Sequence, residues 1–372
     1  MNKCSFIIAT LACFLLLTDI TGAAGSPVKA DGEAQWQKLR QEAAKEGKLV
    51  VYSTTSGDAL REIFTPFQAK FGVKVDYIIG RGEELASRMT TERSASLYLP
   101  DIIMSGGTTL LLTMKPAGLI DTFAGTLILP EVLDSKAWVG GKLPYMDKGP
   151  YAIGMLAVLQ RYIVRNADLV REEELRSYQD ILLPKWKGKI VINDPTLSGA
   201  GNALFSHLAH DVWGMEKTLD FMRQLVKQEP MITRNTALQV EWVARGKYAI
   251  AVAPMQEQVA KFLKAGAPLA HLRAEEGGKI TAGVGCLGLA NKRPHPNAAA
   301  LYANWLLSKE GMAQVVKAYK YPGTRVDSPR TGVPPEFFPS PGEKLFGDTE
   351  EGILIRDEIR KQAREIFASL VK

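Results

Sequence analysis

The sequence is poor in cysteine and histidine and lacks the common signatures of enzymes. It holds three cysteines and four histidines in 372 residues, and three cysteines are too few for a disulfide scaffold. The motifs G-x-S-x-G, G-x-x-x-x-G-K-[ST], H-E-x-x-H and C-x-x-C are absent. His207 and His210 lie three residues apart, but without a third ligand nearby this spacing is weak evidence for a metal. We therefore expect no catalytic residue, no metal centre and no cofactor.

Long runs of one residue type are also missing. Basic residues never form a run of five or more, although the net charge is +6, so an arm that binds nucleic acid is not expected. Apolar residues make up 46% of the chain and charged residues 23%, as in ordinary soluble globular proteins. The length suggests two or three domains with a substantial core.

Residues 1–24 have the features of a cleaved signal peptide. Lys3 gives a short positive start, residues 5–17 form an apolar stretch, and residues 21–24 supply small side chains for the signal peptidase. The apolar stretch is shorter than the roughly 20 residues that a membrane anchor needs. A lipoprotein signal at Cys13 is the alternative, but Cys13 lies inside the apolar stretch. We therefore expect a signal peptide that is removed.

Cleavage near Ala24 or Gly25 would place the mature protein in the bacterial periplasm. No second run of 18 apolar residues follows. Cleavage would also remove Cys4 and Cys13 and leave Cys286 as the single thiol. The mature protein would then form no internal disulfide.

Short apolar stretches alternate with amphipathic stretches along the rest of the chain. Within residues 58–71, for example, apolar side chains recur at positions 60, 63, 64, 67 and 71, which is a helical spacing. This alternation predicts an α/β fold with a mostly parallel sheet. Expected strands span 49–52, 73–79, 101–104, 189–193, 248–253 and 281–290, and expected helices span 34–46, 58–71, 83–93, 214–227, 237–245, 255–265, 296–319 and 350–371.

Three polar turns follow predicted strands and open the next helix. They are STTSG (53–57), SGGTT (105–109) and DPTLSGAG (194–201). Ligands of open α/β sheets bind at the carboxyl ends of the strands, where backbone N–H groups and hydroxyls form a cradle for anions or polar groups. The same residue types are also ordinary helix caps and turn formers. Three such turns in one chain favour contact with a ligand in at least two of them.

The order of these stretches resembles the periplasmic solute-binding proteins of ABC importers, in the ferric-iron-type branch of the family 1 extracellular solute-binding proteins. The resemblance covers about residues 34–370. It rests on AAKEGKLVVYST (43–54), FQAKFGVKVDY (67–77), PDIIMSGG (100–107), LLPKWKGKIVINDPTLSGAGNALF (182–205), VARGKYAIAVAP (243–254) and ANKRPHPNAAALYANWLLSKEG (290–311).

The resemblance implies the two-lobe periplasmic-binding-protein fold of class II, with a small solute closed between lobes that move about a hinge. The crossings between lobes are expected near 149–166 and 282–291. A monomer that delivers its solute to a membrane permease and its ATPase is also implied. The implied lobes are residues 33–152 plus 282–318, and residues 153–281 plus 319–372.

Iron-binding members of this family use two adjacent tyrosines after the strand that YAIAVA (248–253) resembles, often with a histidine in the first turn. Here Pro254, Met255 and Gln256 follow that strand, and STTSG holds no histidine. A hard ferric ion prefers phenolate or carboxylate oxygens, whereas these turns offer hydroxyls and amides. Other relatives take phosphorylated sugars, phosphonates, thiamine or polyamines. We therefore expect an anionic solute carrying phosphate or carboxylate; a ferric ion, or an enzyme on the same fold, is the alternative.

Several side chains near the expected cleft could hold such a solute. An arginine fork suits carboxylate or phosphate, although Arg81, Arg234 and Arg325 could equally be solvated surface residues. Aromatic walls could come from Tyr151, Tyr319 and Tyr321. The predicted ligand-binding residues are Ser53, Thr54, Thr55, Arg81, Ser105, Gly106, Gly107, Tyr151, Thr196, Ser198, Gly199, Asn202, Arg234, Asn235 and Gln256.

Overall fold

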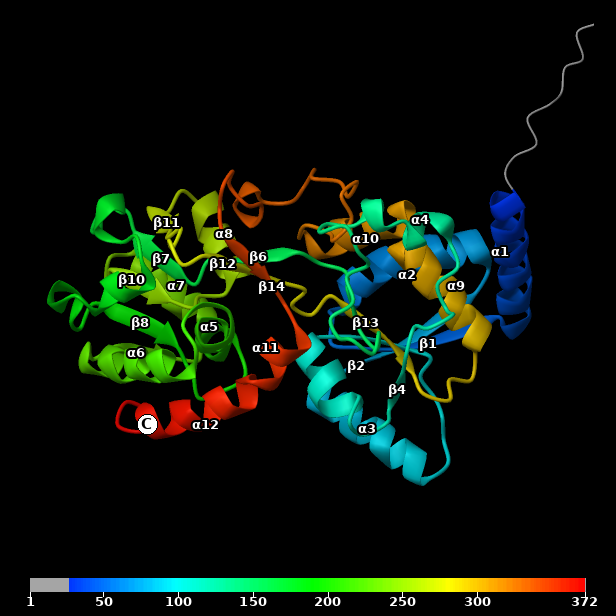
Figure 1. The fold of residues 1–372 in the computed structure, drawn as a ribbon, viewed down its shortest axis with the longest axis horizontal. Helices are drawn as coiled ribbons and strands as arrows, with labels where there is room; N and C mark the ends of the chain where they lie inside the picture. The colour runs from blue at the N-terminus through cyan, green and yellow to red at the C-terminus, as the bar shows by residue number, and fades with distance from the viewer. Residues whose placement is uncertain (1–26, 372) are drawn as a thin grey trace, which may run out of the picture.

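The computed structural model describes residues 27–371, and its side chains from residue 32. The expected signal peptide therefore lies outside the described residues. The chain forms two α/β lobes joined by a small central sheet (Figure 1). This confirms the α/β class expected from the sequence. The expectation of a mostly parallel sheet was wrong, because β7 (Ile163–Asn166) and β13 (Cys286–Ala290), which follow the crossings between the lobes, pair antiparallel with their neighbours.

The first lobe is built on a sheet in the order β2-β1-β3-β13-β4, with β5 also paired to β13. β1, β2 and β3 are parallel, whereas β13 runs antiparallel to β3. The carboxyl ends of β1, β2 and β3 therefore lie at one edge of the sheet, where β13 begins. The strands are β1 (Lys48–Ser53), β2 (Lys74–Ile79), β3 (Ile102–Ser105), β4 (Ile120–Asp121), β5 (Ile153–Gly154) and β13 (Cys286–Ala290).

Helices cover both faces of this sheet because its strands bury alternate side chains in two cores. Leu49 and Val51 of β1 join one core, and Tyr52 joins the other. The first core lies under α1, α2, α9 and α10, and the second under α3. The helices are α1 (Pro27–Glu46), α2 (Gly57–Phe71), α3 (Gly82–Ser94), α4 (Pro130–Leu133), α9 (Pro296–Leu307) and α10 (Lys309–Tyr319), with a short helical turn at Thr109–Met114.

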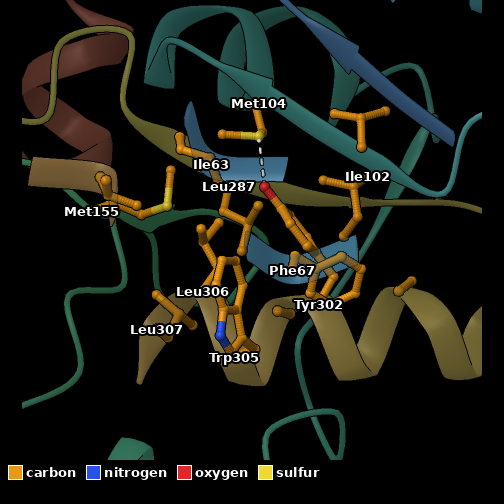
Figure 2. Close-up of a cluster of buried hydrophobic side chains, with 14 of the residues drawn as sticks. Ile63, Phe67, Ile102, Met104, Met155, Leu287, Tyr302, Trp305, Leu306 and Leu307 are labelled. Carbon is orange, nitrogen blue, oxygen red and sulfur yellow. Dashed lines mark hydrogen bonds between the residues drawn. The ribbon is translucent and has the colours of Figure 1, made fainter. Parts of the chain in front are cut away.

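The larger core of the first lobe is rich in aromatic rings (Figure 2). The ring centroids of Phe67 and Tyr302 lie 5.0 Å apart in an edge-to-face arrangement, and those of Phe67 and Trp305 lie 5.3 Å apart. The Tyr302 hydroxyl reaches the Met104 sulfur at 3.3 Å. Met104 is the residue before the SGGTT turn, so this packing fixes the base of that turn.

The second lobe has the same layered design. Its sheet runs β11-β7-β10-β8-β9, with β8, β9 and β10 parallel and β7 antiparallel to β10. One face packs on α5, α6 and α12, and the other on α7 and α8. The elements are β7 (Ile163–Asn166), β8 (Ile190–Asn193), β9 (Met231–Thr233), β10 (Ile250–Val252), β11 (Leu269–His271), α5 (Ala200–His207), α6 (Met215–Lys227), α7 (Thr236–Ala244), α8 (Gln256–Lys264) and α12 (Arg356–Ile366), with a helical turn at Leu208–Val212.

The hinge sheet joins the lobes and has the order β14-β12-β6. β6 (Val158–Gln160) leads from the first lobe to the second, and β12 (Gly278–Thr281) leads back, antiparallel to β6. β14 (Leu345–Gly347) pairs with β12 in parallel and continues into α11 (Glu350–Leu354). The central position of all three strands is visible in Figure 1.

Three expected elements are interrupted in the structure. The long helix expected over 296–319 breaks at Ser308, whose backbone is extended and whose hydroxyl caps Gly311. The helix expected over 350–371 is divided into α11 and α12. The strand expected over 281–290 is two strands, because Gly283 takes a positive φ of 56° in the turn between them. Two of the three breaks thus lie at a small polar residue, Ser308, or at a glycine, Gly283.

Candidate functional site

The STTSG and SGGTT turns lie side by side at the polar edge of the first lobe. Because β1 and β3 are parallel neighbours, Ser53 is in register with Met104. The Thr54 amide donates to the Met104 carbonyl at 3.0 Å, and the Ser53 hydroxyl donates to the same oxygen at 3.1 Å. The Thr55 amide in turn donates to the Ser53 hydroxyl oxygen at 3.0 Å. Ser53 therefore holds the two turns together.

Unlike the Ser53 hydroxyl, the hydroxyls of Thr54 and Ser105 at this edge make no hydrogen bond to the described chain. Both are buried, and neither has a hydrogen-bond partner among residues 27–371. A buried polar group without a partner costs about 1–3 kcal/mol. An acceptor brought to this edge would recover that cost, so the pair is a candidate contact for a ligand.

Gly106 and Gly107 are needed for close packing around the second turn. A Cβ on Gly107 would lie 2.6 Å from the end of the Met146 side chain and 3.2 Å from a methyl of Ile353 in α11. A Cβ on Gly106 would lie 3.3 Å from the Gly283 carbonyl oxygen. The two glycines thus let the C-terminal part of the chain and the turn before β13 approach this edge.

Thr55 is linked to an aromatic residue from far along the chain. Its hydroxyl lies 2.7 Å from the Tyr319 hydroxyl at the end of α10. Burial raises the pKa of Tyr319 to about 12, even though the hydrogen bond to Thr55 opposes this shift. The phenol is therefore neutral at ordinary pH and acts as a hydrogen-bonding partner rather than as an anionic ligand.

The DPTLSGAG turn forms the polar edge of the second lobe together with the end of β9. Thr196 donates to Asp194 through both its amide, at 2.9 Å, and its hydroxyl, at 2.6 Å. The Arg234 guanidinium donates to the other Asp194 oxygen at 3.0 Å and is 65% exposed. Burial alone would raise the pKa of Asp194, but the hydrogen bonds from Thr196 and Arg234 bring it below its ordinary value. One side of the Arg234 guanidinium is therefore paired with Asp194, and the rest is exposed to solvent.

The other predicted residues of the second lobe have varied environments. Ser198 and Gly199 are exposed in the turn. Asn235 caps α7 by accepting from the Leu238 amide at 2.9 Å. Gln256 is buried, and its amide donates to the Arg161 carbonyl at 3.1 Å. Ser198 and Gly199 are thus open to a ligand, whereas Asn235 and Gln256 have structural roles.

The remaining candidates lie apart from one another. Arg81 is 90% exposed, with its nearest carboxylate, Glu84, 4.0 Å away. Tyr151 is half-buried and lies under the Lys115 ammonium, 5.0 Å from the ring centre. Arg325 is buried and bound by Asp327 at 2.8 and 3.0 Å. Arg81 is available to a ligand, and Arg325 is fully occupied.

A C-terminal segment, residues 348–367, connects the polar edges of the two lobes. Arg356 donates to the Thr108 hydroxyl of the SGGTT turn at 2.9 Å, while its own carbonyl accepts from the Asn202 amide of α5 at 3.1 Å. Arg364 lies 3.4 Å from the Thr196 carbonyl. Both polar edges therefore contact the same segment. Figure 1 shows α11 between the lobes and α12 along the second lobe.

Arg356 was missed by the sequence analysis. Its side chain is 22% exposed, its Nε is buried without a partner in the described chain, and Asp348 lies 3.5 Å from its Nη2. Nothing in the local sequence indicates this role, because the residue stands in an ordinary charged helix. Only the return of the chain to the hinge brings it to the SGGTT turn.

A cavity of about 770 Å³ lies beside the hinge, between residues 139–157, the hinge strands and residues 345–351. None of the fifteen predicted site residues lines it. Its carboxylates are paired: Asp147 and Glu350 bind Lys115 at 2.9 and 2.5 Å, and Glu351 binds Lys148 at 3.1 Å. The cavity therefore offers little uncompensated charge to a solute.

Metal-binding geometry is not found in the described part of the chain, where no three His, Cys, Asp or Glu side chains are grouped for an ion. His207 is buried and bonded to Asp211 at 2.7 Å, and Lys279 of β12 binds the same carboxylate at 2.7 Å. Burial would raise the pKa of Asp211, but hydrogen bonds from His207, Lys279 and His210 hold it well below its ordinary value. These histidines serve an ion network at the hinge.

The model of the bacterial extracellular solute-binding proteins matches residues 62–337. The chain belongs to this family. Iron uptake protein A1 of Synechocystis is 23% identical over 324 residues, which are 82% of this chain and 84% of that protein. No helix within residues 27–371 is long and apolar enough to cross a membrane.

Solved structures of other solute-binding proteins share the fold. Trichodesmium FutA, in complex with iron and citrate, has a TM-score of 0.70 at 20% identity, over 86% of this chain and 99% of that one. AfuA of Actinobacillus pleuropneumoniae, with fructose-6-phosphate bound, has a TM-score of 0.63 at 19% identity, over 87% and 98%. This likeness confirms the two-lobe fold.

Proposed function

We propose that this member of the family is the periplasmic receptor of an ABC importer and that it captures a small solute carrying phosphate or carboxylate. The observation that carries the proposal is the pair of buried, unpartnered hydroxyls of Thr54 and Ser105. They stand at the ends of two parallel strands, beside the N-terminus of α2, where partial positive charge favours an anion. The turn that opens α5 and the exposed face of Arg234 lie on the opposite polar edge.

The solute would be held between the lobes and released to a membrane permease with its ATPase. The lobe division expected from the sequence, 33–152 with 282–318 and 153–281 with 319–372, is part of this proposal. So are export through cleavage of the signal peptide and a monomeric state. A reaction in place of transport would need a coupled acid and base or a nucleophile in the site, and the relatives are transport proteins rather than enzymes.

A ferric ion is the second candidate, favoured by the names of the relatives, which include an iron uptake protein and a complex with iron and citrate. The polar edges argue against it, because their groups are hydroxyls and amides with one paired aspartate, whereas ferric iron prefers anionic oxygens. The bound sugar phosphate of AfuA shows that this fold also receives phosphorylated solutes.

Calorimetry on the mature protein distinguishes an anionic solute from a ferric ion. The compounds to be titrated are phosphate esters, carboxylates, ferric citrate and spermidine. We expect binding of a phosphate or carboxylate compound, and about a ten-fold or greater loss in Arg234→Ala, since a hydrogen bond to a charged group is worth roughly 1.5–3 kcal/mol. Arg245→Ala is the matched control, because Arg245 is 76% exposed and also paired, to Glu241, but lies at the far end of α7. Tight binding of ferric ion or spermidine, with no response to any anion, would refute the proposal.

A further inference from the structure

Each polar strand end carries one exposed apolar side chain. Ile79 is 48% exposed, Val284 47%, and Leu197 and Met255 38% each. Single exposed apolar residues are normal on protein surfaces. These four are unusual in their placement, because each stands at the strand edge that carries one of the polar turns described above.

Two of the four belong to the first lobe. Ile79 ends β2, the parallel neighbour of β1, and its Cδ1 lies 3.5 Å from the position that a Cβ on Gly57 would take. Val284 lies in the turn before β13, next to Gly283, whose carbonyl oxygen approaches Gly106. Both side chains therefore stand at the edge that holds the unpartnered hydroxyls.

The other two belong to the second lobe. Leu197 lies within the DPTLSGAG turn after β8, and Met255 follows β10. β8 and β10 are parallel neighbours, so both side chains stand at the same edge as Arg234. The C-terminal segment contacts Thr108 of the first lobe and Asn202 and Thr196 of the second. The four apolar side chains therefore belong to the two strand edges that this segment connects.

We propose that the solute is amphipathic, with an apolar part, such as an aromatic ring or a short hydrocarbon chain, attached to its anionic group. This rests on the proposed function above. The anionic group occupies the polar turns, and the apolar part packs against Met255, Leu197, Val284 and Ile79. Binding sites of small molecules commonly combine a few polar groups that fix orientation with apolar walls that supply affinity. A wholly polar anion would leave these four side chains in contact with water.

A contact between the four side chains when the lobes close is the competing explanation. It would assist every solute equally, because closure is common to all of them. An apolar wall for the solute instead discriminates among anions. A single methylene in an apolar site changes discrimination by roughly 10- to 200-fold, so the two explanations differ by a measurable amount.

Calorimetry on the mature protein with paired anions tests the proposal. The pairs are phenyl phosphate with glycerol 3-phosphate, and benzoate with lactate. We expect the aromatic member of a pair to bind at least about ten-fold tighter. We also expect Met255→Gln and Leu197→Asn to reduce that ratio several-fold, mainly by weakening the aromatic member.

Matched controls come from the same lobe. Met231→Gln changes a methionine that is 43% exposed at the opposite end of the sheet, and Leu183→Asn changes a leucine of the same exposure away from the turns. Both should leave the ratio unchanged. Equal or tighter binding of the polar members, or an equal loss for both members in Met255→Gln, would overturn the amphipathic solute while leaving the anion receptor intact. Binding of neither pair, with tight binding of ferric citrate or spermidine, would overturn both.

Discussion

Neighbouring serine and threonine hydroxyls of the first lobe have opposite roles. Ser53 donates to the Met104 carbonyl and accepts from the Thr55 amide, so its hydroxyl serves the fold. Ser105 is equally buried but has no partner within the described residues. The Ser105 hydroxyl therefore destabilises the ligand-free protein. It stabilises the complex only when a ligand provides an acceptor.

Ser105→Ala should separate stability from binding. We expect the free energy of unfolding to rise by about 1 kcal/mol, because an unsatisfied buried hydroxyl is removed, while the affinity for the proposed anionic solute falls by about ten-fold. Denaturant unfolding and calorimetry measure the two effects. Ser53→Ala is the control and should lower the free energy of unfolding by about 1 kcal/mol. Destabilisation by Ser105→Ala without loss of affinity would show that the hydroxyl is structural.

His271 at the end of β11 should make stability depend on pH. Both ring nitrogens are buried without partners among the described groups, and burial, assisted by the charge of Arg161, lowers the pKa of His271 to about 4. The unfolded chain binds a proton near pH 6.5, whereas the folded chain does not, so stability is full above that pH and falls as the pH drops toward 4. The loss approaches about 1.4 kcal/mol per pH unit.

Unfolding measured between pH 7 and 5 on the native protein and on His271→Leu tests this dependence. The variant should show a flatter profile across that window, whatever its absolute stability. If the free energy of unfolding changed equally with pH in the two proteins, His271 would not be the source of this pH dependence.

At the residue scale, the sequence revealed the turns but not the partners of their side chains. Serine, threonine and glycine after a buried strand indicate a polar edge, and both edges formed where expected. The pairing of Arg234 with Asp194, and that of Thr55 with Tyr319, depend on chain segments 40 and 264 residues away. Local patterns cannot show such contacts, and the predicted ligand contacts themselves stay predictions.

At the scale of elements, strands and helices with strong local signals were predicted closely, and their breaks were not. The helix expected over 58–71 is α2 (Gly57–Phe71), ended by Gly72 at a φ of 69°. The break at Ser308 was missed because the apolar spacing continues across it, although its cause is local: Ser308 caps α10 at the Gly311 amide, and Gly311 lies against the Trp305 carbonyl. The order of β13 beside β3 was likewise beyond local patterns, because the two strands are far apart in sequence.

The contact between Arg356 and the SGGTT turn should hold α11 in place. Arg356→Ala should release α11 from the SGGTT turn, and we expect amide exchange in residues 350–356 to become faster by an amount equivalent to about 1 kcal/mol. Lys361→Ala is the control, because Lys361 is 70% exposed and its pairing with Glu358 is on the surface of α12, where substitutions change stability by less than about 0.5 kcal/mol. Unchanged exchange in Arg356→Ala would show that the apolar packing of Ile353 alone holds the segment.

At the scale of the whole molecule, the family resemblance predicted the two lobes and a hinge, and the structure adds the third strand of that hinge. β6 is the crossing expected within 149–166, whereas the return crossing is β12 (Gly278–Thr281), just before the expected 282–291, which leads into β13 of the first lobe. β14 comes from the C-terminal part of the chain. Composition could not have shown β14, since Leu345–Gly347 lies in a stretch rich in proline and glycine that reads as surface loop.

Closure of the lobes should be visible in solution. Small-angle scattering of the mature protein at saturating solute should give a smaller radius of gyration than without solute, because hinge motion brings the two polar edges together. We also expect the protein to have the mass of a monomer both with and without solute. An unchanged radius with solute bound, as verified by calorimetry on the same sample, would count against hinge closure.

The hinge sheet has a mechanical consequence. Two separate linkers would let the lobes swivel and slide as well as bend. Three hydrogen-bonded strands form a ribbon instead, and a ribbon flexes across its face while it resists shear in its own plane. The buried link from Lys279 of β12 to Asp211 of the second lobe clamps one end of that ribbon. The lobes should therefore move along one path, so that every captured solute molecule presents the same closed surface to the membrane complex.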